Sequence, residues 1–406
     1  MTTVGRWLEG WRLGVLLAGV VALFALAGVI QTWASLGQPY GYGWPPRDDY
    51  EVYHYYAVDV VEHGLAMRSA PAPYYGPTGF GFIYFVALCY RLFGVHPPIV
   101  FVVQSAMLGG SVALLFLAFR RDLRPPAQIM LIGGLASFAF LDVGRHYALQ
   151  LFSENLLICG LALFCNLARL GFVDHRRWAR IAALAALGAI PLVRPNAVLF
   201  VPAALAWVAM RRRGPGVWRD MALGVVVLAA VFSLMGVRNH VAGGRWVLFM
   251  PADWRSFDVP GYGHGLPGAE VVLGPMARRE GGLMVVRVAA HAVWHDPARV
   301  LPEYARRILF VGGFLPLKHP DLRYRPHWML MWSVLGTVLA WRLCRGPRLD
   351  PMMELLLIWL VVYLGPVVVV SSIDNYGFRY VVPGVLPAVA GAVALAAGSC
   401  SSPLYA

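Results

Sequence analysis

Charged residues are scarce in this chain of 406 residues, since only 14% are charged and Lys318 is the one lysine among 34 lysines and arginines. Soluble domains carry about 25% charged residues. A water-soluble protein of this composition would lack the polar surface to cover itself. Because 59% of the residues are hydrophobic and backbone groups in lipid must be satisfied within helices, the composition predicts an all-α membrane protein.

Common catalytic and metal-binding patterns are also missing. The five cysteines show no CxxC spacing and are interpreted as free thiols without a chemical role. No P-loop, Ser-His-Asp pattern or Asp-x-Asp pair occurs, and the last absence argues against a nucleotide-sugar donor held by a metal. "GHGLPG" (263–268) matches a dinucleotide-binding string, but Pro267 interrupts it and no strand precedes it. His291 and His295 could share a metal, although an interfacial face of a helix explains them better.

Apolar runs recur along the chain, and a spanning helix needs about 20 mostly apolar residues. The candidate spans, about ten by this criterion, are residues 13–35, 95–119, 127–147, 151–170, 179–193, 195–210, 221–239, 328–343, 354–372 and 380–399. The first run resembles a signal peptide. It is too long for one and no small-residue cleavage site follows, so we expect it to remain as the first span.

Arginine-rich short loops predict the orientation, because positive residues in short loops stay in the cytoplasm. These loops are "RRDLRPP" (120–126), "DHRRWAR" (174–180), "RRRGPGVWRD" (211–220) and "RLCRGPRLD" (342–350). With ten spans they all fall on one side, together with Arg6 and Arg12. We therefore expect an inner-membrane protein with both termini in the cytoplasm. The long loops 36–94 and 240–327 are then external, and residues 1–406 form one membrane domain.

Four segments are expected to depart from the simple pattern of full spans. Residues 77–94 are apolar enough to cross, but crossing would move arginine-rich loops to the wrong side, so an interfacial helix is predicted. The segments 179–193 and 195–210 are predicted to be two short helices that meet near the outer surface at Arg194. Residues 289–313 are predicted to form an amphipathic interfacial helix.

The stretch "RDDYEVYHYYAVDVVEHG" (47–64) follows the first span. On a helix, Asp49, Tyr53 and Tyr56 share one face. Such a face suits a sugar, because tyrosine rings pack on the C–H surfaces of the sugar and a carboxylate can take a proton from a hydroxyl. The competing interpretation is an interfacial helix with aspartates in water and tyrosines as membrane anchors. From this stretch alone, the second interpretation is favoured.

Further segments match one family in the family's own order over residues 40–390. Asp49, Tyr53 and Ala57 fit its D-x-x-x-Y-x-x-x-A pattern after the first span. The other matching segments are "YYGPTGFGFIYFVALCYRLFG" (74–94), "LVRPNAVLFVP" (192–202), "RNHVAGGRW" (238–246) and "FRYVVPGVLP" (378–387). On these residues the chain resembles the polyprenyl-phosphate-dependent glycosyltransferases of the C-type (GT-C) membrane fold, nearest to the protein O-mannosyltransferase and lipid A aminoarabinose transferase kind.

The resemblance implies an acidic catalytic site at the external face. Asp49 would be the general base that deprotonates the acceptor hydroxyl as it attacks the anomeric carbon, with inversion as the lipid phosphate leaves. Asp48 is the alternative if the register shifts by one residue. A second acidic residue is usual in the next external loop, where Glu154 is the first candidate and Asp142 the alternative. Glu154 could instead be an acid that the dipole favours at a helix N-terminus.

The donor phosphate needs cations, and arginine suits it because its planar fork donates hydrogen bonds in pairs. Arg238, Arg245 and Arg379 fall at predicted outer span ends, and Tyr380 follows the last of them as a further candidate for substrate contact. Anchoring to lipid headgroups explains each arginine about as well. Gly76 stands where some relatives have a lysine, which leaves the donor-phosphate contact open.

Two other functions compete with the transferase. A transporter or flippase of a lipid-linked glycan would line a path with buried charges and show inverted repeats, and no repeat is found. A non-catalytic subunit would keep the fold without needing Asp49. The expected partners are a polyprenyl-phosphate sugar donor, a lipid, glycan or protein acceptor and membrane lipids, but no nucleic acid. No cofactor is expected with certainty, although Asp48 and Asp49 could hold a divalent cation.

Overall fold

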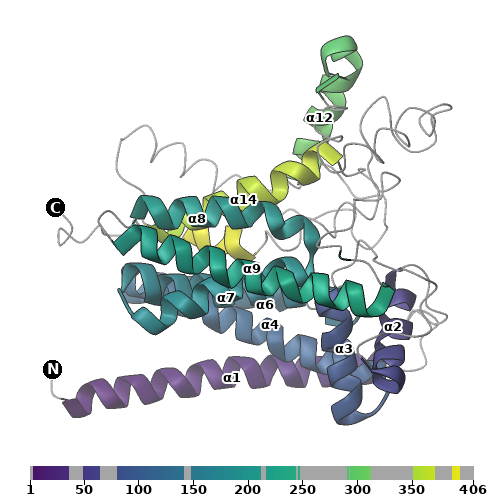
Figure 1. Cartoon of the computed structure of the whole chain (residues 1–406). Helices are drawn as coiled ribbons and strands as arrows, with labels where there is room; N and C mark the ends of the chain where they lie inside the picture. Colours follow the sequence, from purple (N-terminus) through teal and green to yellow (C-terminus); the bar gives the residue numbers. More distant parts are fainter. Residues whose placement is uncertain are drawn as a thin grey trace.

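Helices form every regular element in the part of the chain that the structure describes. The structure is a computed structural model, and it describes residues 3–35, 49–64, 80–140, 148–211, 216–243, 246, 290–291, 293–311, 351–370 and 386–393. The bundle helices are α1 (Thr3–Ser35), α4 (Pro97–Phe119), α5 (Pro125–Phe138), α6 (Glu154–Ala168), α7 (Arg177–Val193), α8 (Phe200–Arg211), α9 (Gly216–Gly243) and α14 (Pro351–Val370). Most of them run alongside one another (Figure 1).

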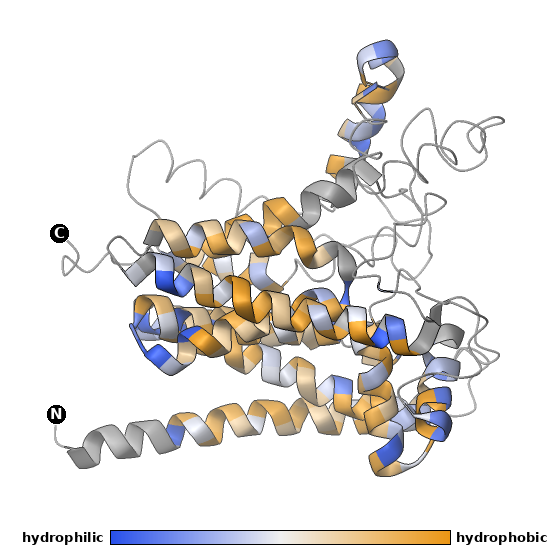
Figure 2. Cartoon of the chain, viewed as in Figure 1, coloured by the Kyte–Doolittle hydropathy of each residue, from blue (hydrophilic) through white to orange (hydrophobic). Residues whose placement is uncertain are grey.

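Among the described residues, four helical stretches are long and apolar enough to cross a membrane. They are Arg12–Ala34, Pro97–Phe119, Glu154–Val173 and Trp218–Arg238, with shorter apolar helices at Phe80–Phe93, Ala197–Met210 and Pro351–Val362. Figure 2 shows apolar residues along the bundle helices and hydrophilic residues mainly near their ends. The predicted all-α, polytopic membrane fold is therefore confirmed. Of the predicted spans, 328–343 lies outside the described residues, and 127–147, 354–372 and 380–399 are described only in part.

A pair of prolines starts two of the bundle helices. Pro97 and Pro98 stand in the first turn of α4, and Pro125 and Pro126 in the first turn of α5. The first turn tolerates proline because its N–H groups have no intrahelical partner in any case. A 3-10 turn, η1 (Arg120–Asp122), follows α4 and separates the two helices. The arginine-rich loop is thus a tight connection between two helices.

α7 ends at the position where the sequence predicts that two short helices meet. Pro195 disfavours helical backbone at the residue before it, and Arg194 has extended dihedrals of φ −145° and ψ 107°. A 3-10 turn, η4 (Pro195–Leu199), then leads into α8. A Cβ placed on Gly81 would lie 2.9 Å from the carbonyl oxygen of Leu192. Because glycine has no side chain, the helix that contains Gly81 can pack directly against the end of α7.

α1 packs on the bundle through glycines. A Cβ added to Gly109 of α4 would lie 2.9 Å from Cβ of Phe24, and one added to Gly28 of α1 would lie 2.6 Å from Cβ of Ser105. Small residues allow helix axes to approach closely in membranes. Much of the rest of α1 is apolar and exposed, as at Leu23 and Leu26. This surface is suited to lipid.

The main core lies between α4, α6, α7, α8 and α14. Trp207 and Trp359 are fully buried in it. The ring of Phe200 packs edge-on against Trp359, with centroids 4.6 Å apart. The indole Nε1 of Trp207 donates to the carbonyl oxygen of Pro351 over 3.1 Å. These contacts hold α14 against α8.

Two short helices, α2 (Asp49–His63) and α3 (Phe80–Phe93), form a second core at one end of the bundle (Figure 1). α3 has 14 residues and is shorter than the roughly 20 residues of a span. A helix therefore forms within residues 77–94, and it is short enough for the expected interfacial position. The external helix expected at 289–313 contains α12 (Pro297–Val311), which projects away from the bundle (Figure 1).

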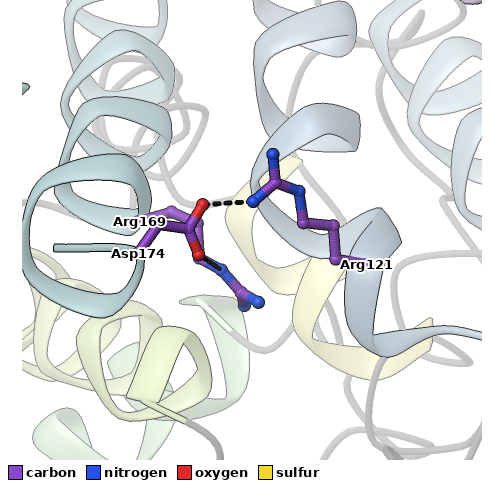
Figure 3. A network of polar contacts seen from close by, with 3 residues as sticks. All are labelled: Arg121, Arg169 and Asp174. Atoms are coloured by element: carbon purple, nitrogen blue, oxygen red, sulfur yellow. Dashed lines mark hydrogen bonds and ion pairs between the residues drawn. The ribbon is translucent and has the colours of Figure 1, made fainter. Parts of the chain in front are cut away.

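The other end of the bundle gathers the arginine-rich connections. Arg121 donates to the carboxylate of Asp174, and Nε of Arg169 lies 3.5 Å from the other oxygen of the same carboxylate (Figure 3). Arg180 pairs with Asp220 over 3.7 Å. These ion pairs bring the loops 120–126 and 174–180 and the start of α9 together. These loops, which were predicted to share one side of the membrane, thus lie at one end of the bundle, while 342–350 lies outside the described residues.

Candidate functional site

The first-loop motif forms α2, and Asp49 is its first residue. Gly64 ends the helix with φ +81°, a conformation that glycine adopts without a steric cost, and its N–H donates to the carbonyl oxygen of Val60 over 3.0 Å. Helical spacing puts Asp49 one turn before Tyr53 on the same face. Because α2 packs against α3, it lies at the end of the bundle that carries α3. Asp48 falls outside the described residues.

The two candidate tyrosines of α2 have different surroundings. Tyr53 is 1% exposed and packs edge-on against Phe82 of α3, with ring centroids 4.8 Å apart. This placement favours a packing role for Tyr53 over an open sugar-binding surface. Tyr56 is half-buried, and Tyr55 is exposed.

Two histidine contacts on α2 were not anticipated from the sequence. Nδ1 of His54 lies 2.8 Å from the hydroxyl of Tyr90 on α3, and burial lowers the pKa of the His54 imidazole below its ordinary value. Nδ1 of His63 lies 2.8 Å from Oδ1 of the buried Asp59. The i,i+4 spacing of Asp59 and His63 is a signal that could have revealed the second contact. The contact to Tyr90 joins distant segments and left no such signal.

Glu154 is the first residue of α6, and its side chain is fully buried. Its Oε1 lies 2.5 Å from Nη1 of Arg194, whose side chain is 8% exposed. The arginine belongs to the "LVRPN" segment but was not among the predicted site residues. Removing one partner of a buried ion pair typically costs about 3–5 kcal/mol, because the other charge is left uncompensated. Each charge therefore stabilises the other in the interior.

Two buried amides lie near the start of α6, one on α6 itself and one on α4. Asn155 follows Glu154 and is fully buried, and neither Nδ2 nor Oδ1 has a hydrogen-bond partner in the described structure. Gln104 of α4 is also fully buried. Its Nε2 donates to the carbonyl oxygen of Gln150 over 2.7 Å, whereas its Oε1 has no partner there. A buried polar group without a partner costs about 1–3 kcal/mol.

Arg238 reaches the same end of the bundle from the last turns of α9. Its guanidinium carbon lies 5.8 Å from the ring centroid of Phe80, the first residue of α3. This distance is within the range of a cation–π contact. The structure thus brings Arg238 near the start of α3, which the end of α7 and the Glu154–Arg194 pair also approach. Four other candidates, Asp142, Arg245, Arg379 and Tyr380, lie outside the described residues.

The described residues contain no group of three or more histidine, cysteine, aspartate or glutamate side chains that could hold a metal ion. His291 and His295 do face each other, with ring centroids 4.0 Å apart. Both are exposed. Two imidazoles alone leave most of a metal's coordination to water, so this pair gives no metal centre near α2 or α6.

Comparison with known proteins supports the fold. No family model matches the sequence, and a search of curated proteins finds no match. The structure resembles the crystal structure of ArnT from Cupriavidus metallidurans bound to undecaprenyl phosphate, with a TM-score of 0.55 and 17% sequence identity. The similarity covers 93% of this chain and 60% of that one, so the chain spans about three fifths of the length of ArnT. The C-type membrane fold that the ordered motifs indicated is therefore confirmed by its likeness to a lipid A aminoarabinose transferase.

Proposed function

We propose that this chain transfers a sugar from a polyprenyl-phosphate donor to a hydroxyl of an acceptor. The observation that carries the proposal is the likeness of fold to ArnT over 93% of the chain. ArnT was crystallised with undecaprenyl phosphate, a polyprenyl phosphate. The motif segments of α2, α3, the end of α7 and the end of α9 also meet at one end of this bundle, as a shared site requires.

The proposed base is Asp49, with Asp48 as the alternative. Its carboxylate would accept the proton of the acceptor hydroxyl while the hydroxyl oxygen bonds to the anomeric carbon. The bond between that carbon and the phosphate oxygen breaks, and the lipid phosphate leaves with the bonding electrons. Attack opposite the leaving group inverts the anomeric configuration.

The proposed phosphate-binding cation among the described residues is Arg238. Its place beside Phe80 at the start of α3 supports this role, because a guanidinium can donate two parallel hydrogen bonds to a phosphate. Glu154 is proposed as a positioning residue, since it is occupied by Arg194 at 2.5 Å. The pair would hold α6 and the end of α7 in place around the reacting groups.

We further propose that the site faces outward from the cell. The arginine-rich connections at the opposite end of the bundle support a cytoplasmic position for that end. The donor would then enter from the outer leaflet of the inner membrane.

The activity is tested with purified protein in detergent, mixed with undecaprenyl-phosphate sugars and candidate acceptors. We expect product from wild type and none from Asp49→Asn, since an amide cannot accept the proton. Glu62→Gln removes an exposed carboxylate from the same helix and should leave turnover unchanged. Unchanged turnover in Asp49→Asn would exclude this base.

A transporter is the second candidate, because the Glu154–Arg194 pair is the kind of buried charge that lines a transport path. The same assay separates the two functions. A transferase forms product without any closed membrane compartment, whereas a transporter has nothing to transport across in detergent. Lack of product with every donor, together with uptake of lipid-linked glycan into vesicles, would favour the transporter.

A further inference from the structure

Two amide side chains at the start of α6 are buried without the hydrogen bonds that they need. Both polar atoms of the Asn155 amide, and Oε1 of Gln104, lack a partner among the described residues, and both side chains are fully buried. Folded proteins satisfy the large majority of such groups. An interior that excludes water makes the exceptions costly. Two of them near one site therefore call for a ligand.

Both amides lie at the same end of the α4–α6 pair. Gln104 donates to the carbonyl oxygens of Gln150 and Ala148, 2.7 and 3.5 Å away, which precede α6 in the chain. Asn155 is the second residue of α6 and follows Glu154, whose carboxylate is already bound to Arg194. The unpartnered amides thus flank the first turn of α6, next to a carboxylate and a guanidinium that neutralise each other.

We propose that Asn155 and Gln104 bind hydroxyl groups of the sugar that the donor carries, and so determine which sugar is transferred. This inference rests on the proposed transferase function and adds the recognition of its sugar. Nδ2 of Asn155 needs an acceptor and Oδ1 needs a donor. A phosphate without protons offers acceptors only and would leave Oδ1 unpaired. Neighbouring sugar hydroxyls both donate and accept, and they can also donate to Oε1 of Gln104.

The alternative is an amide retained for packing alone, and the two explanations make opposite predictions for a leucine at this position. Leucine branches at Cγ as asparagine does, and it has no polar atoms to satisfy. For packing alone, Asn155→Leu should raise stability and leave catalysis unchanged. For sugar binding, stability should be kept or raised while recognition of the sugar is lost. Buried polar groups that break folding rules are expected mainly at functional sites.

The test compares wild type with Asn155→Leu in detergent. We expect an unfolding midpoint at or above that of wild type and a KM for the undecaprenyl-phosphate sugar raised roughly tenfold or more, because a site built to hydrogen-bond a hydroxyl discriminates strongly when a bond is lost. The affinity for undecaprenyl phosphate without its sugar, measured by native mass spectrometry, should not change. Asn166→Leu, a change on the same helix at a half-buried position, should leave the KM unchanged.

An unchanged KM in Asn155→Leu would overturn the proposal, and so would equal weakening of the bare carrier and the sugar-bearing lipid. If Asn155→Leu does not fold, Asn155→Ala removes the same amide with less crowding, and the same preference for weakened sugar binding is required of it. If wild type transfers no sugar at all, the transferase function fails. The binding comparison then still decides the sugar site: a donor that binds no more tightly than its bare carrier in wild type would overturn it.

Discussion

At the scale of residues, the ion pair of Glu154 and Arg194 is the contact whose contribution to the stability of the site can be tested most directly. The two side chains come from positions 40 residues apart and meet at 2.5 Å in the interior. Loss of either partner leaves a buried charge, whereas loss of both leaves none. Their contribution to stability is therefore strongly coupled.

We predict that Glu154→Leu and Arg194→Met each destabilise the protein by about 3–5 kcal/mol, and that the two changes together recover much of this loss. Unfolding midpoints in detergent give the ranking. The exposed pair of Glu303 and Arg306, 3.9 Å apart, is the control and should contribute about 1 kcal/mol or less. Additive losses in the double variant would show that the buried pair is not coupled.

The sequence indicated one member of this pair and not the contact. Glu154 was a candidate because the resemblance implies a second acidic residue in the next external loop. Arg194 was named as the junction of two short helices and as part of a motif, but not as a partner of Glu154, since no periodicity relates residues on α6 and at the end of α7. For Tyr53 the pattern predicted a sugar-binding face, whereas the face that Tyr53 shares with Ala57 packs against α3. Periodicity alone cannot tell a binding face from a packing face.

At the scale of elements, apolar runs predicted where most of the bundle helices lie. The run 95–119 became α4 (Pro97–Phe119), and Pro195 predicted the break before η4. The π-helical turn η3 (Arg169–Val173) at the end of α6 was missed. Nε of Arg180 donates to the carbonyl oxygen of Gly171 over 2.9 Å and supports this turn. A tertiary contact of this kind leaves no mark in hydropathy.

We predict that Gly109→Ala separates α1 from α4. Its Cβ would lie 2.9 Å from Cβ of Phe24 and 3.0 Å from the backbone of Val21, and overpacking of this kind costs about 1–3 kcal/mol. Gly110→Ala is the matched control, since a Cβ there meets nothing within 4 Å. It should stabilise α4 by up to about 1 kcal/mol through helix propensity.

Thermal unfolding of the two alanine variants compares their stabilities, and cross-linking between cysteines on α1 and α4 reports the spacing of the helices. Equal midpoints for Gly109→Ala and Gly110→Ala would mean that α1 does not depend on this close approach. Equal midpoints would also mean that α1 is a loosely attached span.

At the scale of the whole molecule, the two ends of the bundle differ in chemistry. One end joins the arginine-rich connections through Asp174 (Figure 3) and Asp220, and the other carries α2, α3 and Arg238. Composition and the order of motifs predicted an all-α membrane fold, and the likeness to ArnT at 17% identity confirms it. The arrangement of the helices around the site could not be predicted, because it depends on contacts such as Gly81 against Leu192.

We predict that these two ends lie on opposite sides of the membrane. Val95→Cys, in the exposed turn between α3 and α4, and Arg176→Cys, in the exposed turn before α7, place one thiol at each end. A membrane-impermeant maleimide should label Val95→Cys in intact cells, and Arg176→Cys only after permeabilisation. Wild type measures labelling of the native cysteines, of which Cys89 and Cys165 are buried.

Reversed labelling would put α2 and its aspartate in the cytoplasm, where a donor in the outer leaflet could not reach them. Positive residues in short loops are normally retained on the inner side of the membrane. Labelling of both variants from outside would therefore mean that the arginine-rich end does not set the orientation.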